Sequence, residues 1–306
     1  RVKGMLFKLA NGRFSLAKGS LIVLDEAGMV ASDDYQELLR VAATRRCNVI
    51  LSGDERQLTS VGRGGMFEVL AERYGSSSVF DIRRQGSDWG RSVASCFADG
   101  RVLEGLSILE SNDRIKWSSD SKSSMSELLA EWSQSKYDIG DRLILAVKNK
   151  DVAALNHGVR QYMKLEGKLS GPEIEVAGNH YMKGDLIVIG KTDKNLGVVN
   201  GDIGEVLEVG LERFVVSLGG RGRDLGEQTD ARVIEFNPSE FHTFKHGYAT
   251  TVFKAQGASI KDVYVFHDGF AGLRNSYVAL SRHIEELRLY SNRRTCADMK
   301  VPVSYT

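Results

Sequence analysis

Proline and cysteine are both scarce in this sequence, and it contains no long apolar run. Three prolines and no low-complexity stretch in 306 residues leave little room for disorder, despite 32 glycines. Cys47, Cys96 and Cys296 are widely spaced, with no C-x-x-C pair or Cys/His cluster. Reduced thiols are therefore expected, not a disulfide framework or a metal site. No apolar run approaches the ~18 residues of a membrane span and no signal peptide is present, so we expect a cytoplasmic protein.

The overall charge is nearly balanced, at +1. This value argues neither for nor against nucleic acid, because binding needs a local basic surface rather than a net excess. The length allows two domains, each large enough to bury its own core. The chain opens on Arg1 rather than Met, which suggests an excised fragment.

The rest of the chain is organised around a short apolar run followed by two carboxylates. Residues 21–24 are Leu-Ile-Val-Leu, and they predict a strand buried on both faces. Asp25 and Glu26 follow where this strand leaves the sheet, and ligands of open α/β sheets bind at such ends. An Asp suits Mg²⁺, and the adjacent Glu could position or deprotonate a water. The alternative is a solvated strand end.

A second strand is expected at residues 48–52, again followed by polar residues. Between the two strands, Asp34 and Glu37 suggest a helix start, and one helical face carries Tyr35, Leu38, Leu39 and Ala42. The three elements together predict a right-handed βαβ unit.

Two strings in this unit resemble motifs II and III of superfamily 1 helicases. They are Asp25-Glu26-Ala27-Gly28-Met29 and Gly53-Asp54-x-x-Gln57-Leu58. The branch they resemble is the 5′→3′ one, which includes RecD-type proteins and conjugative relaxase-helicases. The resemblance implies ATP and Mg²⁺ as cofactors, with Asp25 holding the metal, Glu26 activating the hydrolytic water and Gln57 sensing the γ-phosphate. Gly53 and Asp54 are carried over as cofactor-binding positions.

A pair of arginines follows the next expected strand, at residues 78–82. An Arg at a strand end is well shaped for a phosphate. The place resembles motif IV, and we assign its γ-phosphate contact to Arg84, with Arg83 as the near rival and a surface Arg pair as the alternative. The local sequence most resembles that of the Ti-type conjugative relaxase-helicases. It reads Asp81-Ile82-Arg83-Arg84-Gln85, with Asp88-Trp89 after it.

Residues 88–135 are predicted to be mainly helical, with a serine-rich surface loop at residues 118–124. The strand pattern restarts at residues 142–147, and a helix begins near Asp151. Lys148, Asn149 and Lys150 lie between them and would supply sequence-independent phosphate contacts to DNA. A solvated helix start is an equal alternative.

Residues 184–192 superficially resemble a P-loop. The pattern G-x-x-x-x-G-K-[ST] needs glycine at position 185, which is Asp185, and residues 186–189 form a predicted strand rather than a phosphate cradle. No other candidate occurs in the 306 residues. In the helicases the P-loop lies upstream of motif II, so the resemblance implies a fragment with negligible ATPase activity of its own.

Short strands and turns dominate residues 186–241 and predict a small antiparallel barrel. In the resembled family an SH3-like subdomain lies here, preceded by a string like residues 196–204 of this chain.

The C-terminal part resembles motifs V and VI. The motif V string runs from His246 to Ser259, and the family's DNA contacts are carried over to His246, Thr250, Thr251, Phe253 and Lys254. Phe253 replaces the family's usual His, which favours base stacking there, with a buried Phe as the alternative. Gln256, Gly257 and Ser259 are carried over as cofactor-binding residues. Residues 275–282 resemble motif VI, and Arg282 resembles its arginine finger.

These patterns predict an α/β fold with two RecA-like domains of the P-loop NTPase type, the first truncated at its N-terminus. The expected boundaries are 1–85 for the C-terminal part of the first domain, 86–140 for a helical linker and 141–306 for the second domain, with an SH3-like insertion at about 196–241. The predicted function is part of an ATP-dependent helicase acting on single-stranded DNA in conjugative transfer. Conjugation machinery or recombination nuclease subunits are the implied protein partners. The alternatives are a RecD-type exodeoxyribonuclease V alpha subunit and a catalytically silent DNA-binding or protein-docking module.

Overall fold

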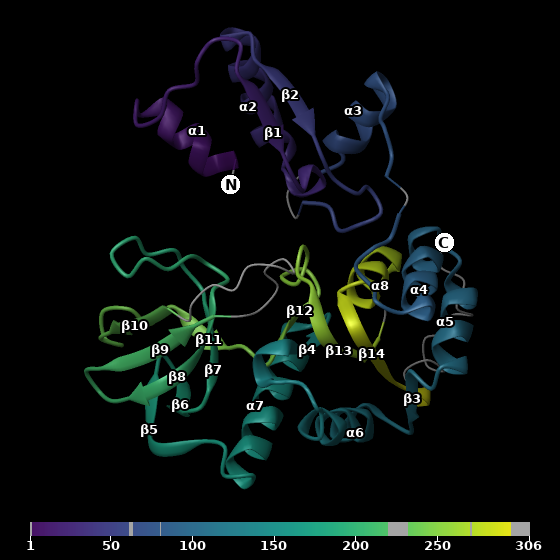
Figure 1. Cartoon of the computed structure of the whole chain (residues 1–306), viewed down its shortest axis with the longest axis vertical. Coiled ribbons are helices and arrows are strands. Elements are labelled where there is room, and N and C mark those ends of the chain that lie inside the picture. Colours follow the sequence, from purple (N-terminus) through teal and green to yellow (C-terminus); the bar gives the residue numbers. More distant parts are fainter. Residues whose placement is uncertain (1, 61–63, 80, 220–231, 270, 295–306) are drawn as a thin grey trace. The chain divides into compact units, whose positions relative to one another are not determined.

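The computed structural model describes residues 2–60, 64–79, 81–219, 232–269 and 271–294. The chain divides into two compact units between Asp81 and Ile82 (Figure 1). None of the described helices is long and apolar enough to cross a lipid bilayer.

The N-terminal unit is built on the predicted βαβ element. Strand β1 (Leu21–Leu24) pairs in parallel with β2 (Asn48–Leu51), and α2 (Ser32–Arg45) connects them. Ile22 packs with Leu38 and Ala42 of α2, as the periodicity predicted. The expectation that β1 is buried on both faces is wrong, because Leu21 and Val23 remain 56% and 63% exposed. The described helices cover only the other face of this two-stranded sheet.

Two further helices occur in the described part of this unit. The first residues form helix α1 (Val2–Ala10), whose Val2 and Met5 pack on the α2 core. A short 3₁₀ turn (η1, Ala27–Met29) follows β1, and α3 (Met66–Tyr74) begins directly after Gly65. No strand is present at the described residues 78, 79, 81 and 82, so the strand expected there is not found, and position 80 lies outside the described residues.

The C-terminal unit contains a five-stranded parallel sheet in the order β12-β4-β13-β14-β3. Its strands are β12 (Ala249–Thr251), β4 (Arg142–Ala146), β13 (Ile260–His267), β14 (His283–Asn292) and β3 (Ile115–Ser118). Its helices are α4 (Asp88–Ala98), α5 (Val102–Ser111), α6 (Ser121–Ser133), α7 (Asn149–Leu165) and α8 (Leu273–Leu280), with a 3₁₀ turn, η2 (Ile139–Asp141). Helices α6 and α7 pack together, and their apolar sides share one core with the sheet (Figure 1).

The segment expected to be a helical linker is largely part of this unit. Helices α4, α5 and α6 occur there, but β3 also forms the sheet edge, with Ile115 opposite Leu289 of β14. The serine-rich stretch is not a surface loop. Asp120 caps α6 by accepting a hydrogen bond from the Ser123 amide at 2.9 Å, and Ser124 is fully buried.

A second, antiparallel sheet lies between α7 and β12 in the sequence. Its order is β10-β9-β8-β7-β11, and a separate hairpin precedes it. The bounds are β5 (Ser170–Val176), β6 (Asn179–Lys183), β7 (Leu186–Ile189), β8 (Ile203–Val209), β9 (Phe214–Leu218), β10 (Arg232–Phe236) and β11 (Phe244–His246). Its core is apolar and rich in phenylalanine. The predicted strands are therefore present, although the sheet begins earlier than position 196. Its assignment as an SH3-like barrel stays a prediction.

Candidate nucleotide and DNA site

The carboxyl ends of β1 and β2 bring the two motif-like strings of the N-terminal unit together. Leu24 lies opposite Leu51 in the parallel register, so both strands end at the same edge. The Ser52 amide donates to the Leu24 carbonyl and the Ala27 amide donates to the Ser52 carbonyl, each at 2.8 Å. These bonds carry the ladder past the strand ends and hold the two loops against one another.

Gly53 makes this close approach possible. A Cβ at position 53 would lie 3.2 Å from the Ala27 nitrogen and 3.3 Å from the Gly28 nitrogen, tighter than ordinary contacts. Gly53 therefore supports the loop geometry whether or not it also contacts a nucleotide.

Glu26 has a left-handed backbone, with φ 51° and ψ 42°. This conformation is uncommon for a residue other than glycine and occurs often at functional sites. The preceding Asp25 is exposed at the strand end. The described residues contain no cluster of three or more His, Cys, Asp or Glu side chains that could hold a metal. A single exposed carboxylate still fits Mg²⁺, because Mg²⁺ usually takes one or two carboxylates together with waters and phosphates.

Asp54 and Gln57 form a local hydrogen-bonded group. The Asp54 carboxylate accepts from the Arg56 amide at 3.0 Å and from Arg56 Nε at 2.8 Å, and Gln57 Nε2 lies 3.4 Å from its other oxygen. Asp54 thus has a structural role in this turn. In the described part of the chain, Gln57 Oε1 is buried and accepts no hydrogen bond, so the amide retains one polar atom that a ligand could satisfy.

In the C-terminal unit, Arg84 joins residues from three separate strings. Its Nε donates to Ser259 Oγ at 2.9 Å and its Nη1 donates to the Ser281 carbonyl at 3.1 Å. The neighbouring Gln85 is 1% exposed and donates to the carbonyls of Ser281 and His283, both at 3.0 Å. The sequence analysis did not single out Gln85, because its partners Ser281 and His283 lie nearly 200 positions away.

Arg282 lies next to this cluster but is 1% exposed. Its Nε donates to the Val278 carbonyl and its Nη2 donates to Ser281 Oγ, both at 3.0 Å. The Ile260 amide donates to the Arg282 carbonyl at 3.0 Å, so the residue sits where β13 and β14 begin. The structure therefore brings Arg84, Ser259 and Arg282 to the amino-terminal edge of the parallel sheet. Gln256 and exposed Gly257 lie on the loop that leads to Ser259.

The predicted DNA-binding residues lie mainly at the opposite edge. Thr250 and Thr251 are on β12, and the Val252 amide donates to the Ala146 carbonyl at 3.0 Å, so β12 and β4 end together. Phe253 is 36% exposed and Lys254 is exposed on the loop after β12. The other expected contacts, Lys148 and exposed Asn149, begin α7 directly after β4.

Lys148 is held in place by Asp268 at this carboxyl edge. Its Nζ donates to the Asp268 backbone carbonyl and lies 3.7 Å from the Asp268 carboxylate. A phosphate contact by Lys148 would therefore share its ammonium group with Asp268.

His246 does not lie with the other DNA-binding candidates. It belongs to the antiparallel sheet, where its ring packs against Tyr181 and Tyr248, and its Nε2 lies 3.0 Å from the His180 carbonyl. Burial lowers the pKa of His246, so the imidazole is neutral at neutral pH. A buried neutral ring in this place suits packing better than contact with a phosphate.

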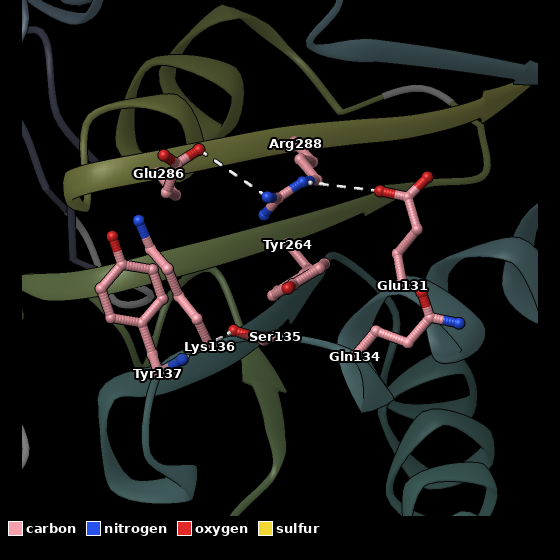
Figure 2. Close-up of a pocket in the computed structure, with 8 residues that line it drawn as sticks. All are labelled: Glu131, Gln134, Ser135, Lys136, Tyr137, Tyr264, Glu286 and Arg288. Atoms are coloured by element: carbon pink, nitrogen blue, oxygen red, sulfur yellow. Dashed lines mark hydrogen bonds and ion pairs between the residues drawn. The ribbon is translucent and has the colours of Figure 1, made fainter.

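The described part of the C-terminal unit also contains a polar cavity of about 340 Å³ (Figure 2). Arg288, a partly exposed cation in its lining, lies over the Tyr264 ring and is paired with Asp262 at 2.9 Å and Glu131 at 3.5 Å. Because carboxylates surround this guanidinium, the cavity is poorly suited to a phosphate, and none of the predicted site residues lines it.

Residues 2–120 match the family model described as an AAA domain. The chain is 32% identical over 289 residues to the conjugal transfer protein TraA of Agrobacterium fabrum, covering 94% of this chain and 26% of that protein. It is 24% identical to the ATP-dependent RecD2 DNA helicase of Deinococcus radiodurans, covering 86% of this chain and 35% of that protein. A crystal structure of Bacteroides Pif1 helicase in complex with ADP-AlF3 and ssDNA superposes with a TM-score of 0.54 at 17% identity, covering 88% of this chain and 70% of that chain.

The parallel α/β architecture is thus the RecA-like fold of the Pif1 helicase structures, as predicted. The similarity to the conjugal transfer proteins TraA extends over nearly the whole chain. The chain spans about a quarter of the length of those relatives.

Proposed function

We propose that this chain is the motor part of an ATP-dependent helicase or translocase that moves along single-stranded DNA during conjugative transfer. The observation that carries the proposal is the meeting of Arg84, Ser259 and Ser281, three residues from separate helicase-like strings, through direct hydrogen bonds. The likeness to TraA favours conjugation over the RecD-type alternative, which matches at lower identity.

The proposed nucleotide-binding groups are acidic or amide side chains in the N-terminal unit and arginines in the C-terminal unit. Asp25 would hold Mg²⁺, which when bound would neutralise charge on the ATP phosphates. Glu26 would orient the attacking water, and Gln57 would contact the γ-phosphate. Arg84 and Arg282 would stabilise the charge that develops during phosphoryl transfer, and for Arg282 this requires its guanidinium to leave its bond to the Val278 carbonyl.

The proposed DNA site uses contacts that do not depend on base sequence. Thr250, Thr251 and Lys254 would bind backbone phosphates, and the partly exposed Phe253 ring would stack on a base. Asn149 would add a phosphate contact from the start of α7. We assign His246 to packing, given its place in the antiparallel sheet.

We expect the 306-residue chain alone to bind DNA but to hydrolyse ATP negligibly. No G-x-x-x-x-G-K-[ST] string occurs in it, and Asp185 in the superficially similar stretch is fully buried. DNA-stimulated ATPase activity of the purified chain at an ordinary motor rate would contradict this part of the proposal.

The DNA site can be tested with a matched pair of lysines. Lys254 lies on the loop after β12, whereas Lys245 is an exposed lysine on β11 of the antiparallel sheet. We expect Lys254→Ala to weaken binding of a fluorescent oligothymidylate and to lower the salt dependence of the affinity by about one counterion. Lys245→Ala should change neither quantity. Equal effects of the two substitutions, or no binding by the unaltered chain, would refute the proposed DNA site.

A further inference from the structure

The two halves of the proposed DNA site lie on different elements. Helix α7 begins at Asn149 directly after Lys148, and strand β12 carries Thr250 and Thr251. Within the described residues β12 is an edge strand with β4 as its one neighbour, so the outward backbone groups of Ala249 need partners from elsewhere.

The side chain of Asn156, in the middle of α7, supplies those partners. Its Oδ1 accepts from the Tyr248 amide at 3.1 Å and from the Ala249 amide at 3.0 Å, and its Nδ2 donates to the Ala249 carbonyl at 3.0 Å. Nδ2 also donates to the Val152 carbonyl of its own helix at 2.9 Å. One buried carboxamide thus takes the place that a neighbouring strand would occupy.

The chemistry of this position is demanding. Asparagine offers an acceptor and a donor on one short planar group, whereas aspartate lacks the donor and leucine lacks both. Asparagine is also a poor helix former, yet Asn156 lies inside a helix of 17 residues and is only 8% exposed. Its contacts with β12, rather than helix stability, explain why this residue is present.

The same helix holds β12 a second time through Asp185. Arg160 of α7 donates to Asp185 at 3.1 Å, and the Tyr248 hydroxyl donates to the same carboxylate at 2.7 Å. The start of β12 is therefore fixed to α7 on two sides of Tyr248.

We propose that Asn156 is a positioning residue for DNA binding. Its carboxamide sets the placement of β12 against α7, so that the threonines of β12 and the amino-terminal residues of α7 meet the same DNA backbone. This inference rests on the proposed function.

The test compares two substitutions that remove the same kind of helix bond. Asn156→Asp keeps the shape and the acceptor but removes the donor to the Ala249 and Val152 carbonyls. Asn112→Asp is the matched control, because Asn112 Nδ2 makes the same bond to the carbonyl four residues earlier, Ile108, at 2.7 Å, but is exposed. We expect Asn156→Asp to weaken oligothymidylate binding about tenfold, at a temperature well below its melting point, and Asn112→Asp to leave it unchanged.

Acidification provides a rescue that a merely structural role would not show. The introduced carboxyl regains a donor when it is protonated, and burial favours protonation. The affinity of Asn156→Asp relative to the Asn112→Asp control should therefore recover as the pH is lowered to about 5. If Asn156→Asp does not fold, the same affinity is measured for Asn156→Ser. This variant also lacks the bridge, because a serine hydroxyl is too short to bond both the amide and the carbonyl of Ala249. Unchanged affinity in the folded variant would overturn the inference.

Hydrogen exchange separates failure of this inference from failure of the proposed function. If the unaltered chain does not bind DNA, the proposed function fails, and exchange at residues 248–252 still tests the positioning role. We expect these amides to exchange faster in Asn156→Asp than in Asn112→Asp, with β13 and β14 unchanged. Equal exchange in the two variants would overturn the positioning role whatever the DNA result.

Discussion

Asp185 offers the strongest test of how the antiparallel sheet is joined to the parallel sheet. Its side chain is fully buried and accepts three kinds of hydrogen bond: from Arg160 Nε at 3.1 Å, from the Tyr248 hydroxyl at 2.7 Å and from the Met182 amide at 2.7 Å. These donors come from α7, from the start of β12 and from β6. The substitution Asp185→Ala removes the acceptor common to all three.

The expected loss in the free energy of unfolding depends on which hydrogen-bond partners each donor keeps after the substitution. Breaking a buried ion pair by removing one partner costs about 3–5 kcal/mol. Arg160 keeps its ion pair with Glu173 at 2.6 Å, which favours the lower end of this energy range. The Tyr248 hydroxyl oxygen still accepts a hydrogen bond from the Leu186 amide at 3.1 Å. Only the Met182 amide loses its side-chain acceptor outright, at about 1 kcal/mol. A total of about 3–4 kcal/mol follows, which in a unit of this size lowers the melting temperature by about 10 °C.

Denaturant and thermal unfolding of the purified chain would measure this loss. The control is Glu235→Ala, which breaks an ion pair with Arg213 at 2.9 Å between two side chains that are each half exposed. Such a surface pair contributes at most about 1 kcal/mol. If Asp185→Ala costs no more than Glu235→Ala, the buried carboxylate does not join the elements as described.

The remaining predictions concern two glycines and a histidine. Gly158→Ala should destabilise the chain by about 1–3 kcal/mol, because the added Cβ would lie 2.5 Å from a methyl group of Leu129. In Gly4→Ala, in α1, the added Cβ meets nothing within 4 Å, so this substitution should stabilise the chain by about 0.5–1 kcal/mol. Urea unfolding measures both changes. Burial lowers the pKa of His283 to about 4, against about 6.5 in an unfolded chain. The unfolded state therefore binds more protons between those values, and stability falls as the pH drops through that window. His283→Gln should reduce this fall in unfolding measurements at about pH 7.5 and about pH 5, and an unchanged pH dependence would contradict it.

Local patterns predicted much of the secondary structure. Strands β9 and β10 lie in the stretch 186–241 that was predicted to form short strands, because turn residues and alternating apolar residues mark such strands within the segment itself. Strand β3 was missed for the opposite reason. Four residues between two helices carry little signal, and their partner in β14 lies far away in the sequence.

Burial could not be predicted from the apolar run at residues 21–24. Four apolar residues indicate a strand, but the exposure of Leu21 and Val23 depends on what covers the second face of the sheet. The serines before α6 were misinterpreted because serine is common both in loops and at helix starts, and the capping bond of Asp120 decides between them.

In the candidate site, too, residues with a local sequence signal could be predicted and residues defined by distant contacts could not. Asp25, Gln57, Arg84 and Arg282 could be proposed because each lies in a recognisable string. Asn156 and Gln85 could not, because their importance comes from bonds to residues nearly a hundred or more positions away. A residue that orients other residues leaves little trace in its own local sequence.

The loop at residues 252–259 has a special place in this arrangement. It leaves the carboxyl end of β12 after Thr251 and reaches the amino-terminal end of β13 at Ser259, so it connects the two opposite edges of the parallel sheet. Its first turn is fixed by bonds from the Lys254 and Ala255 amides to the Thr251 carbonyl, and its last residue is fixed by Arg84. Under the proposed function the first end meets DNA and the second meets the nucleotide. These eight residues are the shortest covalent connection between the two edges, because the other described connections to β13 and β14 include whole strands or helices.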